Sequence, residues 1–365
     1  MRFPEFSGEW ESNELHKVAS LSKGAGISKD QLSDSGHPCI LYGELYTKYK
    51  SEIIREVYSK TQLDVANLVK SHTNDVIIPC SGEAAIEIAT ARCVLIPDVL
   101  LGGDLNIIRL NGRHDGGFFA YQLNGKRKVD IAKVAQGVSV VHLYGEHLKK
   151  VKVAYPSLEE QQKISSFLAL LDERIATQIK IIEKLESLIK GLCQKLTQQD
   201  NPNTALNETL VCYSSTLQES SVQEVGDYPV YGATGVCGYT DAPEVDGDSI
   251  LIIKDGASVG VTYYASGKYS AIGTLNRLVA KRGYSLRYLY YCLRVFNFAP
   301  YRTGLAIPHI YFRDYGKAKV WCPSLDEQQL IADALTKVEQ KIAIAKSLLE
   351  QLYSQKRFLL QAMFI

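Results

Sequence analysis

Few groups of residues in this sequence have types and spacings that could bind a metal ion. His142, Glu146 and His147 have the composition of an inverted zinc-protease motif. That motif places two residues between the first histidine and the glutamate, whereas three separate them here. The corresponding stretch later in the chain contains His309 and Arg313, which do not make a second ligand set. We therefore expect no metal site.

Motifs for nucleotide and methyl-transfer chemistry are also missing. The Gly-Lys pairs at Gly125, Gly267 and Gly316 are not followed by the serine or threonine of a triphosphate-binding loop. The sequence has no Pro-Pro dipeptide, which excludes the Asn-Pro-Pro-Tyr signature of amino-methyltransferases. The pair Pro97-Asp98 has no carboxylate-x-lysine partner at nuclease spacing. We expect no catalytic residue and no bound cofactor in this chain.

Charge is unevenly distributed along the sequence. In total, 41 Lys and Arg residues nearly balance 40 Asp and Glu residues. Between Asp248 and Trp321, however, there are eleven basic and three acidic residues, together with ten of the 22 tyrosines. Basic side chains neutralise phosphates and aromatic rings lie against bases, so this window is typical of a nucleic-acid interface. The alternative is a solvated charged surface over a tyrosine-rich β core.

An internal repeat must position these residues. The heptapeptide at Pro156, Pro-Ser-Leu-Glu-Glu-Gln-Gln, returns 167 residues later at Pro323 as Pro-Ser-Leu-Asp-Glu-Gln-Gln. The same offset relates His142 to His309 without a gap. The chain therefore contains two copies of one unit, and each copy is a globular domain followed by a long helix.

A long helix is expected after each heptapeptide. Ser157 and Ser324 can cap the first amides, and the glutamate three residues later can complete a capping box. A helix of roughly 40 residues is ~60 Å long, more than one globular core uses. Because both copies lie in one chain, we expect the helices to pair within it; an intermolecular homodimeric coiled coil is the alternative. The apolar residues have the four-three spacing of a coiled-coil seam: Ile164, Leu168, Leu171, Ile175, Ile182, Leu185, Ile189, Leu192 and Leu196, then Ile331, Leu335, Val338, Ile342, Leu349, Leu352, Leu359 and Met363, interrupted at Gln178, Ala345 and Lys356.

The segments before the helices are rich in β-strand patterns. Strands are expected at residues 75–79, 93–96 and 105–110, and at residues 40–46, which lead into a basic loop. Residues 116–123 are apolar, and periodicity does not separate helix from strand there. The predicted fold class is α+β, with two β-rich domains that are each followed by a long helix. The expected boundaries are 1–155 for the first domain, 156–199 for the central helix, 200–322 for the second domain and 323–365 for the C-terminal helix.

The chain resembles the specificity (S) subunits of type I restriction-modification systems. The resemblance rests on the opening Arg-Phe-Pro-Glu-Phe-Ser-Gly-Glu-Trp at residues 2–10, on the two heptapeptides and on the duplicated domain-helix plan. It covers essentially the whole chain, although the lead-in with Trp10 has no clear counterpart before Tyr231. It implies two target-recognition domains that each read one half of a bipartite, non-palindromic double-stranded DNA site. It also implies that the helices pair as an antiparallel coiled coil, which sets the separation of the domains.

The resemblance further implies partner subunits. Two modification (methyltransferase) subunits would dock on the helices and carry S-adenosylmethionine. Restriction (motor and nuclease) subunits would supply ATP-driven translocation and cleavage, with the ATP and Mg²⁺ that these need. The chain itself would be a non-catalytic subunit without a cofactor. The candidate partner-binding residues are Glu160, Gln161, Gln162, Glu327, Gln328 and Gln329.

Candidate DNA-binding residues are chosen by expected exposure and charge. Lysine and arginine are expected to hold phosphates, while a few loop side chains read base edges. Gln136 and Thr303 precede Gly137 and Gly304, where glycine permits close backbone approach; a β-turn without a ligand is the alternative. The candidates are Thr47, Lys48, Lys50 and Gln136 in the first domain and Thr234, Lys254, Arg277, Arg302 and Thr303 in the second.

Cysteine spacing and the lack of long apolar segments indicate a cytoplasmic protein. The tightest cysteine spacing, Cys80 to Cys93, suits neither a zinc site nor a redox motif, so we expect reduced core thiols. No signal peptide and no apolar run of ~20 residues is found, so no membrane partner is expected. The alternative function is a non-enzymatic coiled-coil scaffold whose globular domains bind protein, and such a scaffold would bind DNA weakly and without sequence preference.

Overall fold

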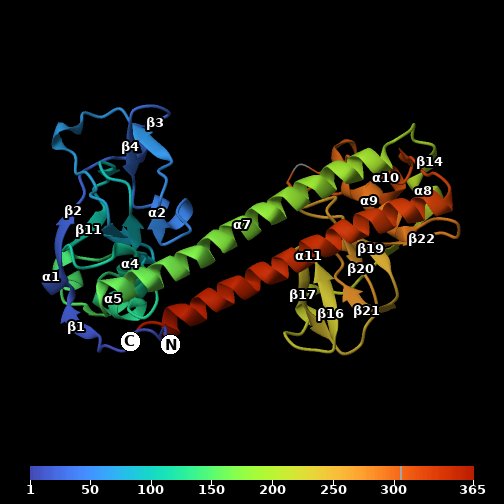
Figure 1. Ribbon diagram of the computed structural model, residues 1–365. Coiled ribbons are helices and arrows are strands. Elements are labelled where there is room, and N and C mark those ends of the chain that lie inside the picture. Colours follow the sequence, from blue (N-terminus) through green and yellow to red (C-terminus); the bar gives the residue numbers. More distant parts are fainter. Residues whose placement is uncertain (305) are drawn as a thin grey trace. The chain divides into compact units, whose positions relative to one another are not determined.

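The computed structural model describes residues 1–304 and 306–365, which form two units. The first unit comprises residues 1–179 and 347–365, and the second comprises residues 180–346. Each unit contains β-sheets and part of two long helices, α7 (Leu158–Thr197) and α11 (Leu325–Ala362) (Figure 1). The expected α+β architecture, with a long helix after each β-rich domain, is confirmed.

The first unit is built on a sheet with strand order β2-β11-β7-β9-β5. Every residue of β7 is buried, because this strand lies inside the sheet with side chains covered on both faces. A second sheet has the order β10-β4-β6-β3. The strands of the two sheets are β2 (Ala19–Lys23), β11 (Leu105–Leu110), β7 (Asp75–Pro79), β9 (Arg92–Val94), β5 (Ile53–Ile54), β10 (Leu100–Leu101), β4 (His37–Ile40), β6 (Ser59–Thr61) and β3 (Leu32–Ser33).

Two short strand pairs tie the ends of the first domain together. The pair β1 with β13 joins the lead-in to the strand that enters α7, and the pair β8 with β12 lies beside the loop at residues 136–142. Short helices connect the strands. These elements are β1 (Glu11–Glu14), β13 (Lys152–Tyr155), β8 (Ser81–Gly82), β12 (Val141–His142), α1 (Leu15–Val18), α2 (Glu44–Thr47), α3 (Ala85–Ile88), α5 (Lys128–Val134) and α6 (Gly145–Leu148).

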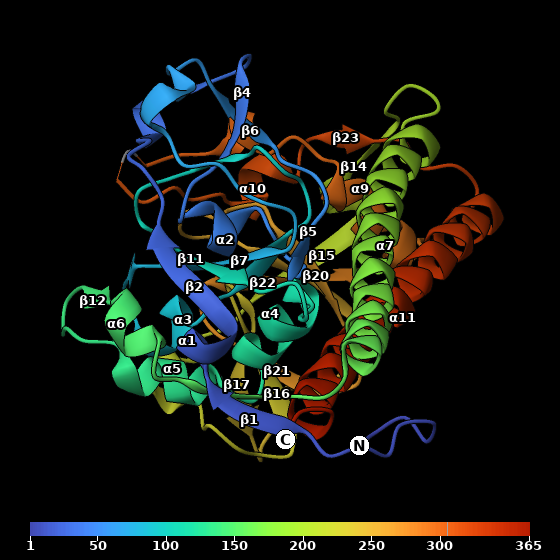
Figure 2. The same cartoon turned by 60° about the vertical axis from the view of Figure 1, so that its left-hand side comes forward.

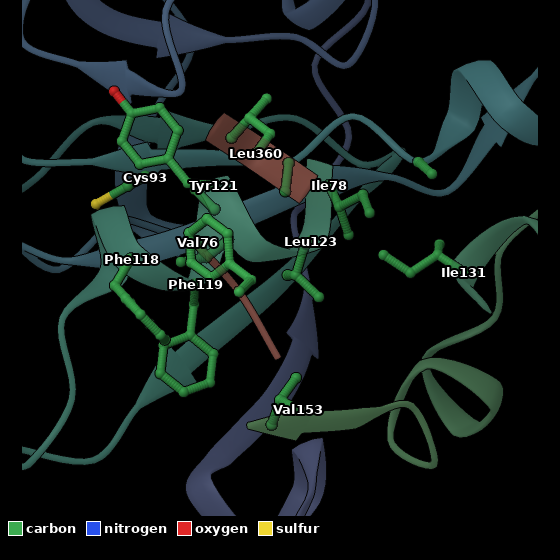
Figure 3. Close-up of a cluster of buried hydrophobic side chains, with 14 of the residues drawn as sticks. Val76, Ile78, Cys93, Phe118, Phe119, Tyr121, Leu123, Ile131, Val153 and Leu360 are labelled. Atoms are coloured by element: carbon green, nitrogen blue, oxygen red, sulfur yellow. The ribbon is translucent and has the colours of Figure 1, made fainter. Parts of the chain in front are cut away.

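Helix α4 (Gly116–Asn124) lies at the centre of the core of the first unit. Asp115 caps it by accepting a hydrogen bond from the backbone N–H of Phe118 at 2.7 Å. Its residues from Gly116 to Leu123 are all buried, which explains why the sequence shows no amphipathic period there. In Figure 3, Phe118, Phe119, Tyr121 and Leu123 of α4 lie in one cluster with Val76 and Ile78 of β7 and Leu360 of α11.

The second unit repeats this arrangement. Its sheets have the orders β15-β22-β19-β20 and β17-β16-β21-β18, and β14 pairs with β23. The lead-in β14, α8 and β15 replays β1, α1 and β2 without a tryptophan, and Leu206 at the start of α8 is buried like Leu15 at the start of α1. The elements are β14 (Thr204–Ala205), α8 (Leu206–Thr209), β15 (Leu210–Ser214), β16 (Tyr228–Gly232), β17 (Gly235–Thr240), β18 (Val245–Asp246), β19 (Ser249–Ile253), β20 (Thr262–Ala265), β21 (Lys268–Ala271), β22 (Leu275–Ala280), α9 (Leu286–Arg294), α10 (Phe312–Tyr315) and β23 (Lys319–Val320).

The two long helices pack against each other in opposite directions. In the first unit, Leu171 and Ile175 from the first half of α7 share a buried cluster with Leu352 from the last turns of α11. In the second unit, Ile189 from the end of α7 shares a cluster with Leu335 from the start of α11. Figures 1 and 2 show α7 and α11 side by side from two directions. The predicted antiparallel coiled coil is confirmed.

The predicted caps of the long helices are partly formed. The hydroxyl of Ser157 accepts a hydrogen bond from the N–H of Glu160, and that of Ser324 accepts one from Glu327, each at 3.4 Å. The Glu160 carboxylate does not return to the cap; it accepts two hydrogen bonds from the guanidinium of Arg2, at 2.6 and 2.7 Å. The glutamate of the first heptapeptide therefore holds the N-terminal segment.

The eight cysteines are free thiols, and six of them are buried. Burial raises the pKa of Cys39, Cys80 and Cys193 to about 11, so these thiols stay protonated at neutral pH. Among the helices that the structure describes, none is both long enough and apolar enough to span a bilayer.

Candidate nucleic-acid interface

Both units carry the same hairpin loop just before the strand that leads toward a long helix. In the first, Gln136 and His142 exchange backbone hydrogen bonds of 2.9 and 2.7 Å. In the second, Thr303 and His309 exchange bonds of 2.9 and 2.7 Å. The two loops are related by the repeat offset of 167 residues. We call them the repeat hairpins, residues 136–142 and 303–309, of which residue 305 lies outside the described structure.

A glycine is required at the second position of each repeat hairpin. Gly137 has a φ of +122° and Gly304 a φ of +87°, in the region that side chains rarely adopt. A Cβ at either position would collide with a carbonyl oxygen across the loop, that of Val140 or Ile307. The turn alone therefore explains both glycines. Their tight turns leave apolar side chains in solvent, since Val138 is 97% exposed and Ile307 is 57% exposed.

Each repeat hairpin rests on a turn that follows a central strand. In the first unit, His142 pairs with Ser81, whose hydroxyl donates to Asp104 at 2.7 Å. In the second, the ring of His309 lies 2.8 Å from Asp255, and the two residues also form a β-bridge. The His309 side chain therefore has a structural role in its hairpin, whereas the His142 side chain is exposed and the residue pairs there through its backbone.

The candidates Thr47, Lys48 and Lys50 lie on and just after helix α2. The prediction of a strand through residue 46 is wrong, because β4 ends at Ile40 and residues 44–47 are helical. Buried Glu44 turns the chain there, since its carboxylate accepts a hydrogen bond from the N–H of Leu41 at 2.9 Å. Residues 44–47 are helical and not extended, but the side chains of Thr47, Lys48 and Lys50 are still exposed.

These three side chains also have partners within the chain. Thr47 donates to the carbonyl of Gly43 at 3.0 Å, and Lys50 donates to that of Tyr46 at 3.1 Å. Lys48 is bound more firmly, by an ion pair with Glu44 at 2.7 Å and a hydrogen bond to Ser59 at 2.6 Å. Lys48 is therefore less available to a phosphate than Lys50.

Helix α2 lies close to the first repeat hairpin. A Cβ on Gly82 would lie 3.3 Å from the hydroxyl of Tyr46 on α2, and Gly82 pairs with Val141 at the base of the hairpin. The structure thus brings Thr47 and Gln136, which are far apart in sequence, onto neighbouring elements of one unit.

In the second unit, Lys254, Arg302 and Thr303 come together at the other repeat hairpin. The carbonyl of Lys254 accepts a hydrogen bond from the N–H of Ile310 at 2.9 Å, next to the residue that pairs with Thr303. The exposed side chain of Arg302 donates one bond to the carbonyl of Val259 at 3.1 Å.

Arg277 lies in a row across the sheet β15-β22-β19-β20, and Thr234 lies at a turn of the neighbouring sheet. Arg277 in β22 is opposite Leu251 in β19, and Leu251 is opposite Tyr263 in β20. The Tyr263 hydroxyl donates to the carbonyl of Ala233 at 2.9 Å, beside Thr234 at the β16-β17 turn. The guanidinium of Arg277 lies 4.3 Å from the ring centre of Tyr213. This stacking holds the arginine on the sheet.

The basic window is less cationic than its sequence indicates. Arg294 lies 2.5 Å from Glu339, and Arg287 lies 4.0 Å from the same carboxylate. Glu339 is on α11, outside the window, so the count of eleven bases misses it. Half of the ten tyrosines of the window are buried core residues, namely Tyr269, Tyr288, Tyr290, Tyr291 and Tyr315. The core explanation therefore holds for these five.

The heptapeptide residues divide into two groups. Glu160, Gln161 and Gln328 are each only 1% exposed and are bonded within the chain, which corrects their expected direct contact with a partner subunit. Gln162, Glu327 and Gln329 are exposed and stay candidates. The sequence missed this division because all six are polar.

The zinc-protease-like residues have separate partners. The ring of His147 lies 3.2 Å from the carbonyl of Val134, and Glu146 pairs with Lys149 at 2.6 Å. Across residues 1–304 and 306–365, the structure contains no cluster of three His, Cys, Asp or Glu side chains able to hold a metal ion.

The sequence is similar to known restriction-enzyme subunits. It is 26% identical over 204 residues to a protein of Methanocaldococcus jannaschii described as the specificity subunit of type I restriction enzyme MjaX, which covers 53% of this chain and 46% of that protein. It is 26% identical over 112 residues to the EcoprrI specificity subunit of Escherichia coli, covering 31% of this chain and 28% of the relative. The chain thus spans less than half the length of these curated relatives.

Solved structures share the fold over nearly the whole chain. The S subunit of a type I restriction-modification system from M. genitalium is 18% identical, with a TM-score of 0.68 covering 100% of this chain and 99% of that one. A chain from a study of complex assembly of the type I system is 15% identical, with a TM-score of 0.59 covering 98% and 97%.

The model of one protein family matches both units. The type I restriction modification DNA specificity domain matches residues 7–187 and again residues 213–354. These two segments include most of the strands and the repeat hairpin of each unit, together with most of both long helices. The chain therefore belongs to the family of type I restriction-modification DNA specificity subunits.

Proposed function

We propose that this chain recognises a bipartite site on double-stranded DNA, with one half read by each unit. The repeat hairpins carry this proposal, because the same exposed loop stands at the same repeat position in two otherwise diverged domains. Family membership supports DNA as the ligand. Candidate contacts cluster at or near the hairpins: Thr47, Lys50 and Gln136 in one unit and Lys254, Arg302 and Thr303 in the other. Lysine and arginine would hold phosphates, and the short polar side chains would read base edges.

The paired helices are proposed as the spacer between the half-sites. Helix α7 has 40 residues, so at 1.5 Å per residue it is ~60 Å long. Half-site spacing on DNA follows the geometry of the protein that reads it. A pair of antiparallel helices with a buried seam resists bending better than a single helix, which favours one fixed spacing.

We further propose that the helices dock two modification subunits, and that restriction subunits join them. Exposed apolar side chains, which docking would cover, lie on both helices: Phe167, Leu170, Ile181 and Leu188 on α7, and Leu330, Ile344 and Phe358 on α11. Gln162, Glu327 and Gln329 lie near the start of each helix as polar contacts. The chain would be non-catalytic and cytoplasmic, and S-adenosylmethionine, ATP and Mg²⁺ would belong to its partners.

The experiment is methylome sequencing of the host with the gene intact, deleted and restored. We expect adenine methylation at one bipartite motif to disappear on deletion and to return on complementation. If the methylome does not change, a pull-down of the tagged chain tests for a bound methyltransferase. Capture of a methyltransferase with no motif lost would contradict the recognition role. If no methyltransferase is captured and no motif is lost, a protein-binding scaffold is favoured.

A further inference from the structure

Each unit contains a carboxylate that a core tyrosine binds, and this carboxylate is buried in the first unit but 26% exposed in the second. Asp172 on α7 and Glu339 on α11 are related by the repeat offset of 167 residues. The hydroxyl of Tyr121 on α4 donates to Asp172 at 2.8 Å, and the hydroxyl of Tyr291 on α9 donates to Glu339 at 2.6 Å. In each unit a core tyrosine thus binds an acid on the long helix that follows its own domain.

In the first unit the neutralising cation comes from the other long helix. The Nζ of Lys356 on α11 lies 2.5 Å from Asp172 and 2.5 Å from Glu52. The three side chains are only 12%, 6% and 7% exposed. Burial alone would lower the pKa of Lys356, but the two carboxylates outweigh it and raise the pKa above its ordinary value. Lys356 is therefore charged inside the core.

The other buried cation nearby is directed elsewhere. The guanidinium of Arg92 donates to the backbone carbonyls of Leu45, Tyr49 and Ala91. Its charge helps to balance the site, but its N–H groups do not reach the two acids. Two buried carboxylates thus face two cations, and the removal of Lys356 would leave one negative charge uncompensated.

In the second unit the cation comes from the domain itself. Arg294 at the end of α9 lies 2.5 Å from Glu339. At the matching last position of α4, the first unit has Asn124, which is neutral. On α7, the residue at the repeat position of Lys356 is Ile189, which is buried in the apolar core of the second unit. The cation is therefore supplied by the other long helix in the first unit and by the domain's own core helix in the second.

We infer that Lys356 makes the first unit selective for α11 and excludes a second copy of α7 from the same place. A second α7 would present Ile189 to Glu52 and Asp172 and leave a buried charge without its partner. In the reverse arrangement, α11 packed on the second unit would bring Lys356 toward Arg294. Breaking a buried pair by removal of one partner is strongly destabilising, which disfavours the first arrangement. The second arrangement is disfavoured because two cations would then lie at the carboxylate that Arg294 already neutralises.

Apart from position 356, the buried positions of the two segments differ in kind at one place, where Cys193 of α7 corresponds to Leu360 of α11. Residues 180–195 of α7 and 347–362 of α11 align without a gap. Their seam positions hold leucine or isoleucine in both helices, as at Leu185 and Leu352. An apolar seam alone would accept either helix, whereas a single polar residue in a coiled coil can specify the partner. The structure places that residue at 356.

The test uses two full-length chimeras in which residues 180–195 replace residues 347–362. The first has isoleucine at position 356, and the second keeps Lys356. Limited proteolysis measures the release of the C-terminal segment, and urea unfolding measures the midpoint of the first unit. We expect the first chimera to release the segment roughly 100-fold faster than wild type, and the second to recover most of that loss. Equal behaviour of the two chimeras would overturn the inference.

A second set of variants separates charge from packing. K356I in the natural chain should lower the urea midpoint, and the added changes E52Q and D172N should recover at least half of the loss by removing the buried charges. Ile189→Leu, at the same repeat position, is the packing control and should change the midpoint little. A triple variant no more stable than K356I would also overturn the inference, because the lysine would then act through its alkyl chain alone.

Discussion

The side-chain carbonyl of Gln161 accepts a hydrogen bond from the backbone N–H of Asp115 at 2.9 Å. Gln328 makes the same bond to Ser285 at 3.0 Å in the second unit. Asp115 and Ser285 cap the helices α4 and α9, so the glutamine of each heptapeptide joins the first turn of a long helix to the start of the core helix. The duplicated Glu-Gln-Gln sequence is thus explained in part by the fold itself.

Gln161→Ala should destabilise the first unit. It would leave the N–H of Asp115 and the carbonyl of Pro156 without their partner, at a cost of about 1–3 kcal/mol in the free energy of unfolding. Gln162→Ala is the matched control, because Gln162 is exposed and its loss should change stability by less than ~0.5 kcal/mol. Urea unfolding measures both. Equal effects would contradict the structural role of Gln161.

The helix seam should respond unequally to the same change at equivalent positions. Leu352→Ala removes a fully packed side chain and should cost about 2–5 kcal/mol. Leu185→Ala, 167 residues earlier, should cost less because Leu185 is only partly buried. Denaturant unfolding followed by circular dichroism gives both values. A larger loss at Leu185 would contradict this packing of the seam.

The repeat hairpins should be sensitive to a single added methyl group. Gly137→Ala and Gly304→Ala each force a side chain into a positive-φ position and against a carbonyl oxygen, so the loop must change shape. We expect weaker binding to the motif found by methylome sequencing, with the thermal unfolding of the sheets nearly unchanged. Gly112→Ala, where a Cβ meets open space, is the control. If both hairpin variants bound DNA with wild-type affinity, the proposed role of the hairpins in DNA binding would be contradicted.

Arg302 should contribute one phosphate contact. Arg302→Ala should weaken site binding and reduce the slope of log K against log salt by roughly 0.9. Arg294→Gln removes a guanidinium that is bound to Glu339, so its slope should match wild type. DNA titrations at several salt concentrations, below the unfolding temperature of either variant, measure the affinity and the slope. An unchanged affinity and slope for Arg302→Ala would exclude that residue.

Stability of the first unit should fall as the pH drops below about 6.5. His114 is buried against Tyr155, at 4.6 Å between ring centres, and burial lowers the pKa of His114 below its ordinary value. The unfolded chain, with a histidine pKa of about 6.5, therefore binds more protons below that pH, and acid favours unfolding. His114→Phe should flatten the dependence of the unfolding free energy on pH between 7 and 5. A variant with the wild-type slope would contradict this cause.

The sequence predicts those parts of the fold that local pattern determines. The long helices follow from their apolar spacing, and β7 and β11 follow from short apolar runs. Helix α4 could not be recognised as a helix, because a fully buried element has no polar face to give a period. Helix α2 was missed since its first residue, Glu44, is buried and accepts a hydrogen bond from the hydroxyl of Ser59, 15 residues later in the chain.

The candidate site is predictable only where the repeat helps. Gln136 and Thr303 were chosen because a glycine follows each at the same repeat position, and both are exposed in the repeat hairpins. The availability of a basic side chain, by contrast, depends on which acids the fold brings next to it. Arg294 is neutralised by Glu339, 45 residues later, and Lys48 by Glu44, which the helical turn of α2 brings beside it. Net charge in a sequence window therefore overestimates the charge that a ligand meets.

The first unit takes its last helical turns from residues 347–365, whereas the second unit is one continuous stretch of chain. On the ribosome, the earlier domain must therefore wait with the acids Glu52 and Asp172 unpaired until Lys356 emerges. The second unit has all of its residues earlier and can complete its core first. We therefore expect the domain that is made first to be completed last, with its apolar surface exposed for longer during synthesis.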